Sequence, residues 1–349
     1  MSSPPLPELV RDPRWFPFDL DRQTGAIRFA DVGEGWPDWN RFFSHTEKDG
    51  PIRQQSLPAP ELLKLAGGEP PRLNFIWHTA YCCSTAIAKA LEVPGRSTAH
   101  LEPQVLISLA HTRRQSDREA RGDLAWLSEA VFRLLARPYA SGASATVKPA
   151  PTSSYLTGDA ALKTKGRMLF LYSDCKSFLL STLRYGEHRR RFVRSLFRDI
   201  RAETRWSRRW TPEAMAEITD LEVASLVWQL QIVRFRESML RLGDRAASLD
   251  CETFLAEPRT TIETLWHYFE LPGRPDESPL IADAGYLNRH AKFAGQEFAR
   301  DRHREAARHV APEVLAEVER IAEASYDLFP ENRGALPLAR PLLGASLTP

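Results

Sequence analysis

The sequence predicts an α/β fold, with one three-layer domain on a mainly parallel central sheet, an N-terminal extension and C-terminal helices. Apolar runs alternate with helical patterns between about residues 73 and 270, an order typical of parallel sheets covered on both faces. The run at 167–172, RMLFLY, is continuously apolar, as expected for a strand buried on both faces. The segment 75–91, FIWHTAYCCSTAIAKAL, has the layout of a strand, a short loop and a helix.

The predicted elements follow one another with short connections. The first strand is the apolar run at 73–77, and the first helix begins at Thr85 and ends before Pro94-Gly95. The other predicted strands are 97–101, 143–148, 167–172 and 246–249. The other predicted helices are 105–110, 124–135, 176–183, 189–205, 212–242, 258–269, 296–309 and 312–324. The Pro-, Ser- and Thr-rich segment 149–158 is predicted to be a loop.

The length of 349 residues allows one large domain with extensions. We expect an N-terminal accessory region at 1–70, the α/β domain at 71–310, and a C-terminal helix and tail at 311–349. Prolines and Gly67-Gly68 near residues 56–72 predict the first boundary. Aromatic residues that would pack the accessory region onto the domain are Trp15, Phe16, Phe18, Trp36, Trp39, Phe42 and Phe43.

Composition excludes several classes of protein. The 47 basic and 45 acidic residues give a net charge of only +2, so no nucleic-acid partner is expected. No apolar run approaches the length of a membrane span, and the N-terminus lacks the pattern of a signal peptide. The four cysteines have no metal-ligand spacing, so we expect no metal site and a reducing, cytoplasmic location.

The loop at 79–85 is the first candidate site. Free N–H groups at the start of a helix favour an anion, and Ser84 or Thr85 would either cap the helix or donate to a phosphate. The loop lacks the lysine of G-x-x-x-x-G-K-[ST], which argues against ATP or GTP. It also contains no glycine, so we expect few residues with positive φ.

A second polar turn follows the strand at 167–172. In Tyr172–Ser181, YSDCKSFLLS, either Lys176 and Ser181 hold a second phosphate or Asp174 simply caps a helix. Both turns lie at carboxyl ends of predicted strands, where ligands bind in such sheets.

The two segments together resemble the sulfotransferase family, in a divergent form of bacterial type. The family's 5′-phosphosulfate loop, P-[KR]-[SG]-G-[ST]-[ST]-L, aligns with Ala80, Tyr81, Cys82, Cys83, Ser84, Thr85 and Ala86. Its 3′-phosphate motif, R-D-P-R-x-x-x-x-S, aligns with Ser173, Asp174, Cys175, Lys176 and Ser181. Further fragments are Glu102-Pro103, Val147-Lys148-Pro149, the segment 250–258 and His290-Ala291-Lys292. The matching fragments occur in the family's order over about residues 72–300, and no single motif is intact.

The resemblance implies a P-loop-like fold and transfer of a sulfuryl group from PAPS to a hydroxyl or amine. It implies a small-molecule or carbohydrate acceptor and no metal. The residues it assigns to the donor are Tyr81, Cys82, Cys83, Ser84, Thr85, Ser173, Lys176, Ser181 and Lys292.

Three departures weaken the implied chemistry. Tyr81 stands at the family's Lys or Arg, Cys83 at its Gly, and Ser173 at its Arg. Because such a transfer needs cations on oxygens that gain charge, other cations would have to substitute. The candidates are Lys148, Lys176, Arg184 and Lys292. The alternative is a catalytically degenerate protein of this fold that binds a nucleotide or partner without turnover.

Glu102 is the first candidate for a catalytic base, because it follows a predicted strand where the donor should bind. Its alternatives are a helix cap and an ion pair. His78 is the second candidate, with a packed histidine as the alternative. Cys82 and Cys83 are interpreted as small residues in place of Ser-Gly rather than as nucleophiles.

A basic run occupies residues 184–210. Its arginines at helical spacing form a stripe, namely Arg191, Arg194, Arg198, Arg201 and Arg205. The stripe would attract an anionic partner, or it is a solvated face neutralised in part by Asp199 and Glu203. We favour the solvated face, because no aromatic residue lies on the helix face that these arginines form.

Overall fold

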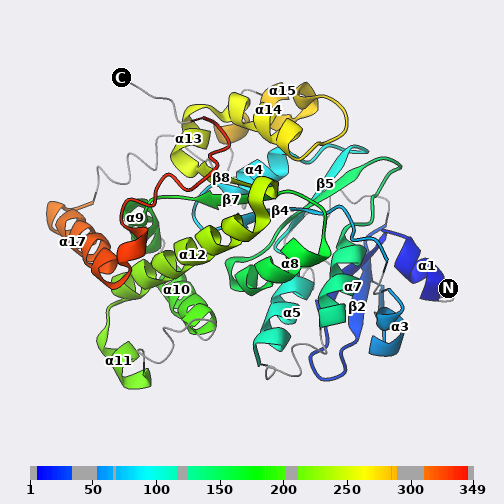
Figure 1. Cartoon of the computed structure of the whole chain (residues 1–349), viewed down its shortest axis with the longest axis horizontal. Helices are drawn as coiled ribbons and strands as arrows, with labels where there is room; N and C mark the ends of the chain where they lie inside the picture. The colour runs from blue at the N-terminus through cyan, green and yellow to red at the C-terminus, as the bar shows by residue number, and fades with distance from the viewer. Residues whose placement is uncertain are drawn as a thin grey trace. The chain divides into compact units, whose positions relative to one another are not determined.

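The computed structural model describes residues 6–33, 53–65, 68–115, 125–184, 186–201, 211–283, 285–288 and 310–344 (Figure 1). A five-stranded sheet has the order β5-β6-β4-β7-β8. Its strands are β4 (Asn74–His78), β5 (Ser97–Leu101), β6 (Ser144–Lys148), β7 (Met168–Tyr172) and β8 (Ala246–Asp250).

The first four strands of that order are parallel. β6 pairs in parallel with both β5 and β4. Phe75 N donates to Arg167 O at 3.0 Å and Thr79 N donates to Leu171 O at 3.1 Å, so β4 and β7 advance in the same direction. With helices flanking this sheet, the predicted α/β class with a mainly parallel sheet is confirmed.

Two predicted elements are wrong. The helix expected at 212–242 is two helices, α11 (Pro212–Glu217) and α12 (Asp220–Leu242), because Thr219 and Glu222 form a reciprocal cap that starts the second one. The expected loop at 149–158 contains a 3₁₀ helix, η2 (Pro151–Leu156), and the start of α8 (Thr157–Lys163). The helix expected at 296–309 lies outside the described residues.

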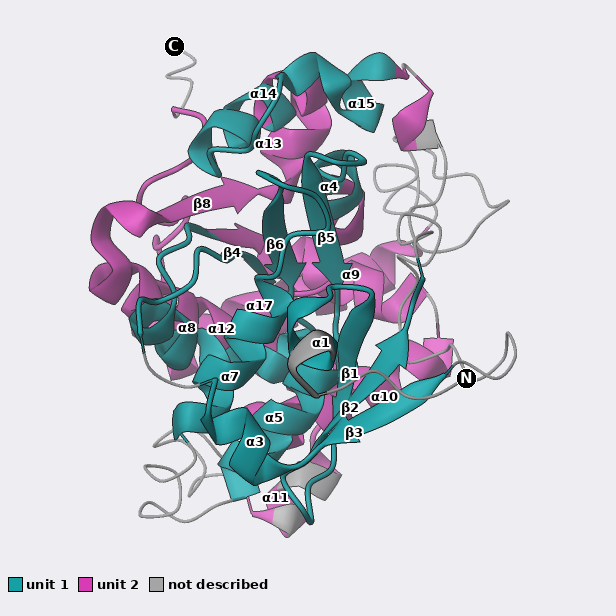
Figure 2. Ribbon diagram, turned by 90° about the vertical axis from the view of Figure 1, so that its right-hand side faces the viewer, with its two compact units in different colours: residues 1–77, 87–168, 262–282 teal, residues 78–86, 169–261, 283–349 magenta. Residues whose placement is uncertain are grey.

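The chain divides into two compact units (Figure 2). Unit 1 comprises residues 1–77, 87–168 and 262–282. It contains an antiparallel sheet of β1 (Trp15–Leu20), β2 (Ile27–Asp31) and β3 (Gln54–Leu57), with β1 against α5 (Gln104–Gln115) and α7 (Ala125–Leu135). Its other helices include α1 (Leu6–Arg11), α3 (Ala59–Leu63) and α15 (Pro279–Ala282). Of the aromatic residues expected to pack this region, Trp15 and Phe16 are buried. Trp36, Trp39, Phe42 and Phe43 lie outside the described residues.

Arg137 anchors the N-terminal segment within unit 1. Its guanidinium donates to the carbonyls of Leu9 at 3.1 Å, Val10 at 2.8 Å, Asp12 at 3.1 Å and Trp15 at 2.6 Å. Hydrogen bonds to a charged group contribute more than neutral ones, about 1.5–3 kcal/mol each. One side chain therefore holds the segment 9–15 on α7 and the turn that follows it.

A close approach of backbones in unit 1 requires Gly166. A Cβ at this position would lie 1.8 Å from the carbonyl oxygen of Leu73. The absence of a side chain lets residues before β7 approach the start of β4, where Asn74 Oδ1 accepts from Arg167 N at 2.9 Å.

Unit 2 comprises residues 78–86, 169–261 and 283–349. Its long helix α12 packs against α9 (Cys175–Arg184), α10 (Gly186–Arg201) and α17 (Pro312–Leu328). α13 (Cys251–Ala256) follows β8 directly, and α14 (Pro258–Tyr268) begins here and continues into unit 1.

The C-terminal tail, for which the sequence predicts no place, pairs with β8 within unit 2. Ser248 N donates to Arg340 O at 2.9 Å, and Leu342 N donates to Ser248 O at 2.7 Å. No helix in the described ranges is long and apolar enough to cross a membrane.

Candidate anion-binding site

The loop after β4 has an unusual backbone. Ala80, Tyr81 and Cys83 have φ values of 75°, 54° and 62°, in the left-handed region. The expectation that a loop without glycine would avoid positive φ is therefore wrong. Each such residue costs about 1–2 kcal/mol, so other contacts must hold the loop.

Three contacts within unit 2 hold the loop. His78 Nδ1 accepts from Ala80 N at 3.1 Å, so this ring nitrogen is unprotonated and acts as a cap. Gln231 Nε2, on α12, donates to Thr79 O at 3.2 Å. Cys82 Sγ donates to Leu171 O at 3.6 Å. The buried imidazole of His78 thus stabilises the loop, which corresponds to the packed-histidine alternative.

Two buried hydroxyls flank the loop and the second turn. Thr85 and Ser173 are 4% and 3% exposed, and their hydroxyl oxygens have no hydrogen-bond partner in the described part of the chain. Thr85, the second residue of α4 (Ser84–Ala90), therefore does not cap this helix with its side chain. Leaving a buried hydroxyl unpaired costs about 1–3 kcal/mol, and such groups in native structures call for an explanation such as a ligand.

A cation also reaches the loop, and the sequence did not single it out. The Arg189 guanidinium carbon lies 4.2 Å from the centroid of the Tyr81 ring, and its Nη1 donates to the carbonyl of Ser181. The Tyr81 ring also packs against Phe178 at 5.3 Å and Phe192 at 6.2 Å. α9, α10 and the loop therefore meet around one arginine and one tyrosine.

Burial raises the pKa of Tyr81 to about 12, although Arg189 acts in the opposite direction. The phenol is therefore protonated at neutral pH. Its buried hydroxyl has no partner among the described residues and joins those of Thr85 and Ser173 as an unused donor.

Two of the cations proposed from the sequence have other partners. Lys176 forms an ion pair with Glu319 of α17, and Lys148 forms one with Glu102. Lys292 and the basic segment around it lie outside the described residues. Asp174 accepts from Ser177 N at 2.9 Å and Ser177 Oγ at 2.6 Å, which is the helix-cap alternative for this turn.

Glu102 lies in unit 1, at the end of β5. Its backbone N donates to Lys148 O at 2.7 Å, and its Oε1 accepts from Lys148 Nζ. The Lys148 side chain is 0% exposed, whereas that of Glu102 is 20% exposed. The ion-pair alternative is therefore present in the structure, and the role of Glu102 as a base stays a prediction.

The arginine stripe is partly neutralised, but by other residues than expected. Arg194 pairs with Asp220 and donates to Ile218 O at 2.9 Å, and Arg191 pairs with Glu187. On the opposite side of α10, Val193, Leu196, Phe197 and Ile200 are buried, as the pattern predicts. Arg205 and Glu203 lie outside the described residues.

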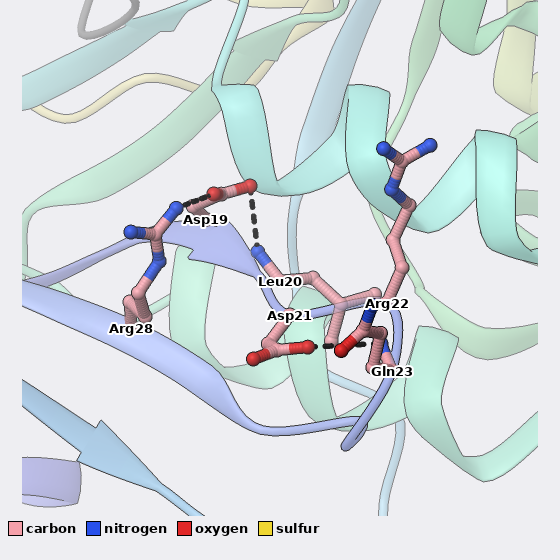
Figure 3. Close-up of a pocket in the computed structure, with 6 residues that line it drawn as sticks. All are labelled: Asp19, Leu20, Asp21, Arg22, Gln23 and Arg28. Carbon is pink, nitrogen blue, oxygen red and sulfur yellow. Dashed lines mark hydrogen bonds and ion pairs between the residues drawn. The ribbon is translucent and has the colours of Figure 1, made fainter.

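A hollow of about 390 Å³ lies elsewhere, at the β1–β2 hairpin of unit 1 (Figure 3). Asp19 pairs there with Arg28 and accepts from Ser108 Oγ at 2.6 Å, and Asp21 accepts from Gln23 N at 2.8 Å. Both carboxylates therefore have partners within the hairpin or on α5. Over the described ranges, no group of three or more His, Cys, Asp or Glu side chains is placed to hold a metal ion.

No protein-family model matches the chain, and no curated protein matches it. Among solved structures, it is similar to the sulfotransferase domain from the curacin biosynthetic pathway, with 10% identity, a TM-score of 0.39, and coverage of 74% of this chain and 98% of that one. It is also similar to a sulfotransferase from Alicyclobacillus acidocaldarius, with 12% identity, a TM-score of 0.36, and coverage of 74% and 96%. At these low TM-scores and identities, function has to be argued from the residues of the chain itself.

Proposed function

We propose that the protein is a sulfotransferase-like enzyme that binds PAPS at the loop 79–85 and the turn 173–181. It would transfer the sulfuryl group to a hydroxyl or amine of a small-molecule or carbohydrate acceptor. The proposal includes a reducing, cytoplasmic location, which the four free thiols support.

The observation that carries this proposal is the set of unused buried donors at the two turns. The hydroxyls of Thr85 and Ser173 lack partners among the described side chains and backbone groups, and each follows a neighbouring strand of the sheet. The carboxyl ends of adjacent parallel strands are where such folds bind ligands. Phosphate and sulfate oxygens would accept from these hydroxyls and remove the cost of leaving them unpaired.

Arg189 supports the proposal because it supplies positive charge where the family's motifs have lost theirs. Its guanidinium contacts both the loop, through Tyr81, and the helix α9 that follows the second turn, through the Ser181 carbonyl. Arginine suits phosphate recognition because its planar fork stays charged and can form two parallel hydrogen bonds.

In the proposed reaction, an oxygen of the acceptor attacks the sulfur in line with the bond to the donor phosphate, and PAP leaves. The acceptor proton passes to a carboxylate, for which Glu102 is our candidate. The loop donors and Arg189 would stabilise charge on the phosphosulfate oxygens as the bond breaks.

Binding without turnover is the second candidate function. It is favoured by the ion pairs that occupy Lys176 and Lys148 and by Tyr81 at the position of a basic residue. Such a protein would bind the nucleotide through the same donors but release no product.

Thermal unfolding with PAPS, PAP and ATP, each with and without magnesium, tests the donor site. Stabilisation by PAP and not by ATP is expected, since a ligand at about 100 times its Kd stabilises the native state by about 2.7 kcal/mol. An unchanged Tm at millimolar PAP would overturn the proposal. Release of PAP from PAPS in the presence of an acceptor panel then separates enzyme from binding protein.

A further inference from the structure

Two cysteines far apart in the sequence meet beside the loop. Cys83 Sγ and Cys251 Sγ are 3.3 Å apart, both within unit 2. Cys83 belongs to the loop, and Cys251 is the first residue of α13, directly after β8. The two sulfur atoms are already in contact, and a disulfide bond of about 2.05 Å would require them to approach by roughly 1 Å more.

The remaining two cysteines are placed differently. Cys82 is 0% exposed, and its thiol donates to the Leu171 carbonyl. Cys175 is 3% exposed, and burial raises the pKa of its thiol to about 12. All four cysteines lie in described ranges, and Cys83 is the one that is not buried. An oxidant from solvent would therefore reach Cys83 first.

We propose that Cys83 and Cys251 form a reversible disulfide that tethers the loop 79–85 to the start of α13. The hydrogen bond with Cys83, together with burial, raises the pKa of the Cys251 thiol well above its usual range. Cys251 is therefore not the thiol that reacts first with an oxidant, and its sulfur, 3.3 Å from that of Cys83, is placed to resolve an oxidised Cys83.

The chemistry requires an oxidant of the hydroperoxide class. The Cys83 sulfur attacks one peroxide oxygen, which gives a sulfenic acid and releases water or an alcohol. The Cys251 sulfur then attacks the Cys83 sulfur, the S–S bond forms, and the sulfenic oxygen leaves as water with the two remaining protons. Both sulfurs are oxidised and the peroxide is reduced, and a dithiol reverses the reaction by exchange.

The disulfide would restrain a loop whose backbone conformation is already unfavourable in free energy. Cys83 holds a φ of 62°, and pulling its sulfur toward α13 constrains this residue and its neighbours Cys82 and Ser84. An effect of the disulfide on donor binding rests on the function proposed above. The disulfide itself and its restraint of the loop do not depend on that function.

The test uses the full chain, treated with hydrogen peroxide and then with a dithiol. We expect an intact mass lower by two hydrogen atoms, a mapped Cys83–Cys251 cross-link, and restoration by the dithiol. Amide hydrogen exchange in residues 79–85 should be about tenfold slower in the oxidised protein. The variants Cys83→Ser and Cys251→Ser should each lose the cross-link, while Cys175→Ser should keep it.

A Cys82–Cys83 cross-link, no cross-link before the thiols become sulfinic acid, or unchanged exchange in the loop would overturn the proposal. PAP titration of the reduced and oxidised protein is read separately. If the reduced protein does not bind PAP, the proposed function fails, although the mapped disulfide and slowed exchange would stand.

Discussion

The guanidinium of Arg189 lies 4.2 Å above the ring of Tyr81, while the same group donates to the carbonyl of Ser181. Arg189 thereby joins the two segments that resemble donor-binding motifs. Tyr81, in the loop, thus supports a cation that α10 supplies. This relationship makes Arg189 the first side chain to test.

Replacement of Arg189 by alanine should weaken PAP binding about tenfold, equivalent to about 1.4 kcal/mol, because a charge and a cation–π contact are lost together. Calorimetric titration measures this change. Arg191→Ala is the matched control, since Arg191 lies on the same helix with a side chain that is 76% exposed. Equal affinities for the two variants would remove Arg189 from the site.

Thr85→Val and Ser173→Ala should lower PAP affinity without lowering stability. Each removes a buried hydroxyl that has no partner within the described ranges, so the free energy of unfolding should stay constant or rise by about 1 kcal/mol. Urea unfolding and PAP titration measure the two effects. A clear loss of stability in either variant would indicate that its hydroxyl is bonded within the protein.

Thr182→Val is the control for this pair. The Thr182 hydroxyl is fully buried and donates to Phe178 O at 3.0 Å, so its loss should cost about 1 kcal/mol of stability. PAP affinity should not change in this variant, since Thr182 already has its partner inside α9.

Glu102→Gln should lower turnover by about 10²-fold with PAP affinity nearly unchanged, because an amide cannot take the acceptor proton. Stability should also fall, since Lys148 keeps a buried ammonium beside a neutral group. Steady-state kinetics with a reactive acceptor, once found, gives the turnover. Full turnover in this variant would exclude Glu102 as the base.

Glu129→Gln separates a catalytic loss from a loss of stability. Glu129 is a paired carboxylate in unit 1, with a side chain that is 17% exposed against 20% for Glu102. It should lose comparable stability and keep its turnover.

His100 should make the protein sensitive to mild acid. Burial lowers the pKa of His100 to about 4 from 6.5, and its Nε2 lies 3.0 Å from Leu135 O. Above pH 6.5 the imidazole is neutral in both states, and stability from this residue is complete. As the pH falls from 6.5 to 4, only the unfolded chain takes up the proton, so stability falls by about 1.4 kcal/mol per pH unit.

Urea unfolding at several pH values tests this slope. In His100→Gln the free energy of unfolding should fall less steeply between pH 6.5 and 4, by the slope that one proton contributes. If the free energy of unfolding changes equally with pH in the parent chain and in His100→Gln, the prediction is wrong.

The sequence predicts the elements of the central sheet well because each strand is a short apolar run between turns. The strand predicted at 97–101 is β5 with the same bounds. The antiparallel sheet near the N-terminus escapes this reasoning, since β1 contains Pro17 and a register shift between Pro17 and Asp19.

The candidate site is only partly predictable for a different reason. Thr85 stands at the start of a predicted helix and Ser173 aligns with a motif of the resemblance, but the contact of Arg189 with Tyr81 depends on how α10 packs. Cys83 and Cys251 are 168 positions apart, and only the fold brings them together. The backbone of Ala80, Tyr81 and Cys83 likewise depends on support from Gln231 and His78, which no local propensity encodes.

The hydrogen bonds of Arg137 have a consequence for shortened versions of the protein. A version that begins at residue 71 would lack the Leu9, Val10, Asp12 and Trp15 carbonyls, leaving the Arg137 guanidinium with the carbonyl of Leu134 at 2.8 Å. It would also lack β1, which packs on α5 and α7, so the shortened chain should expose apolar surface on these helices and aggregate on expression. For production and crystallisation, residues 6–33 are therefore best kept with the rest of unit 1.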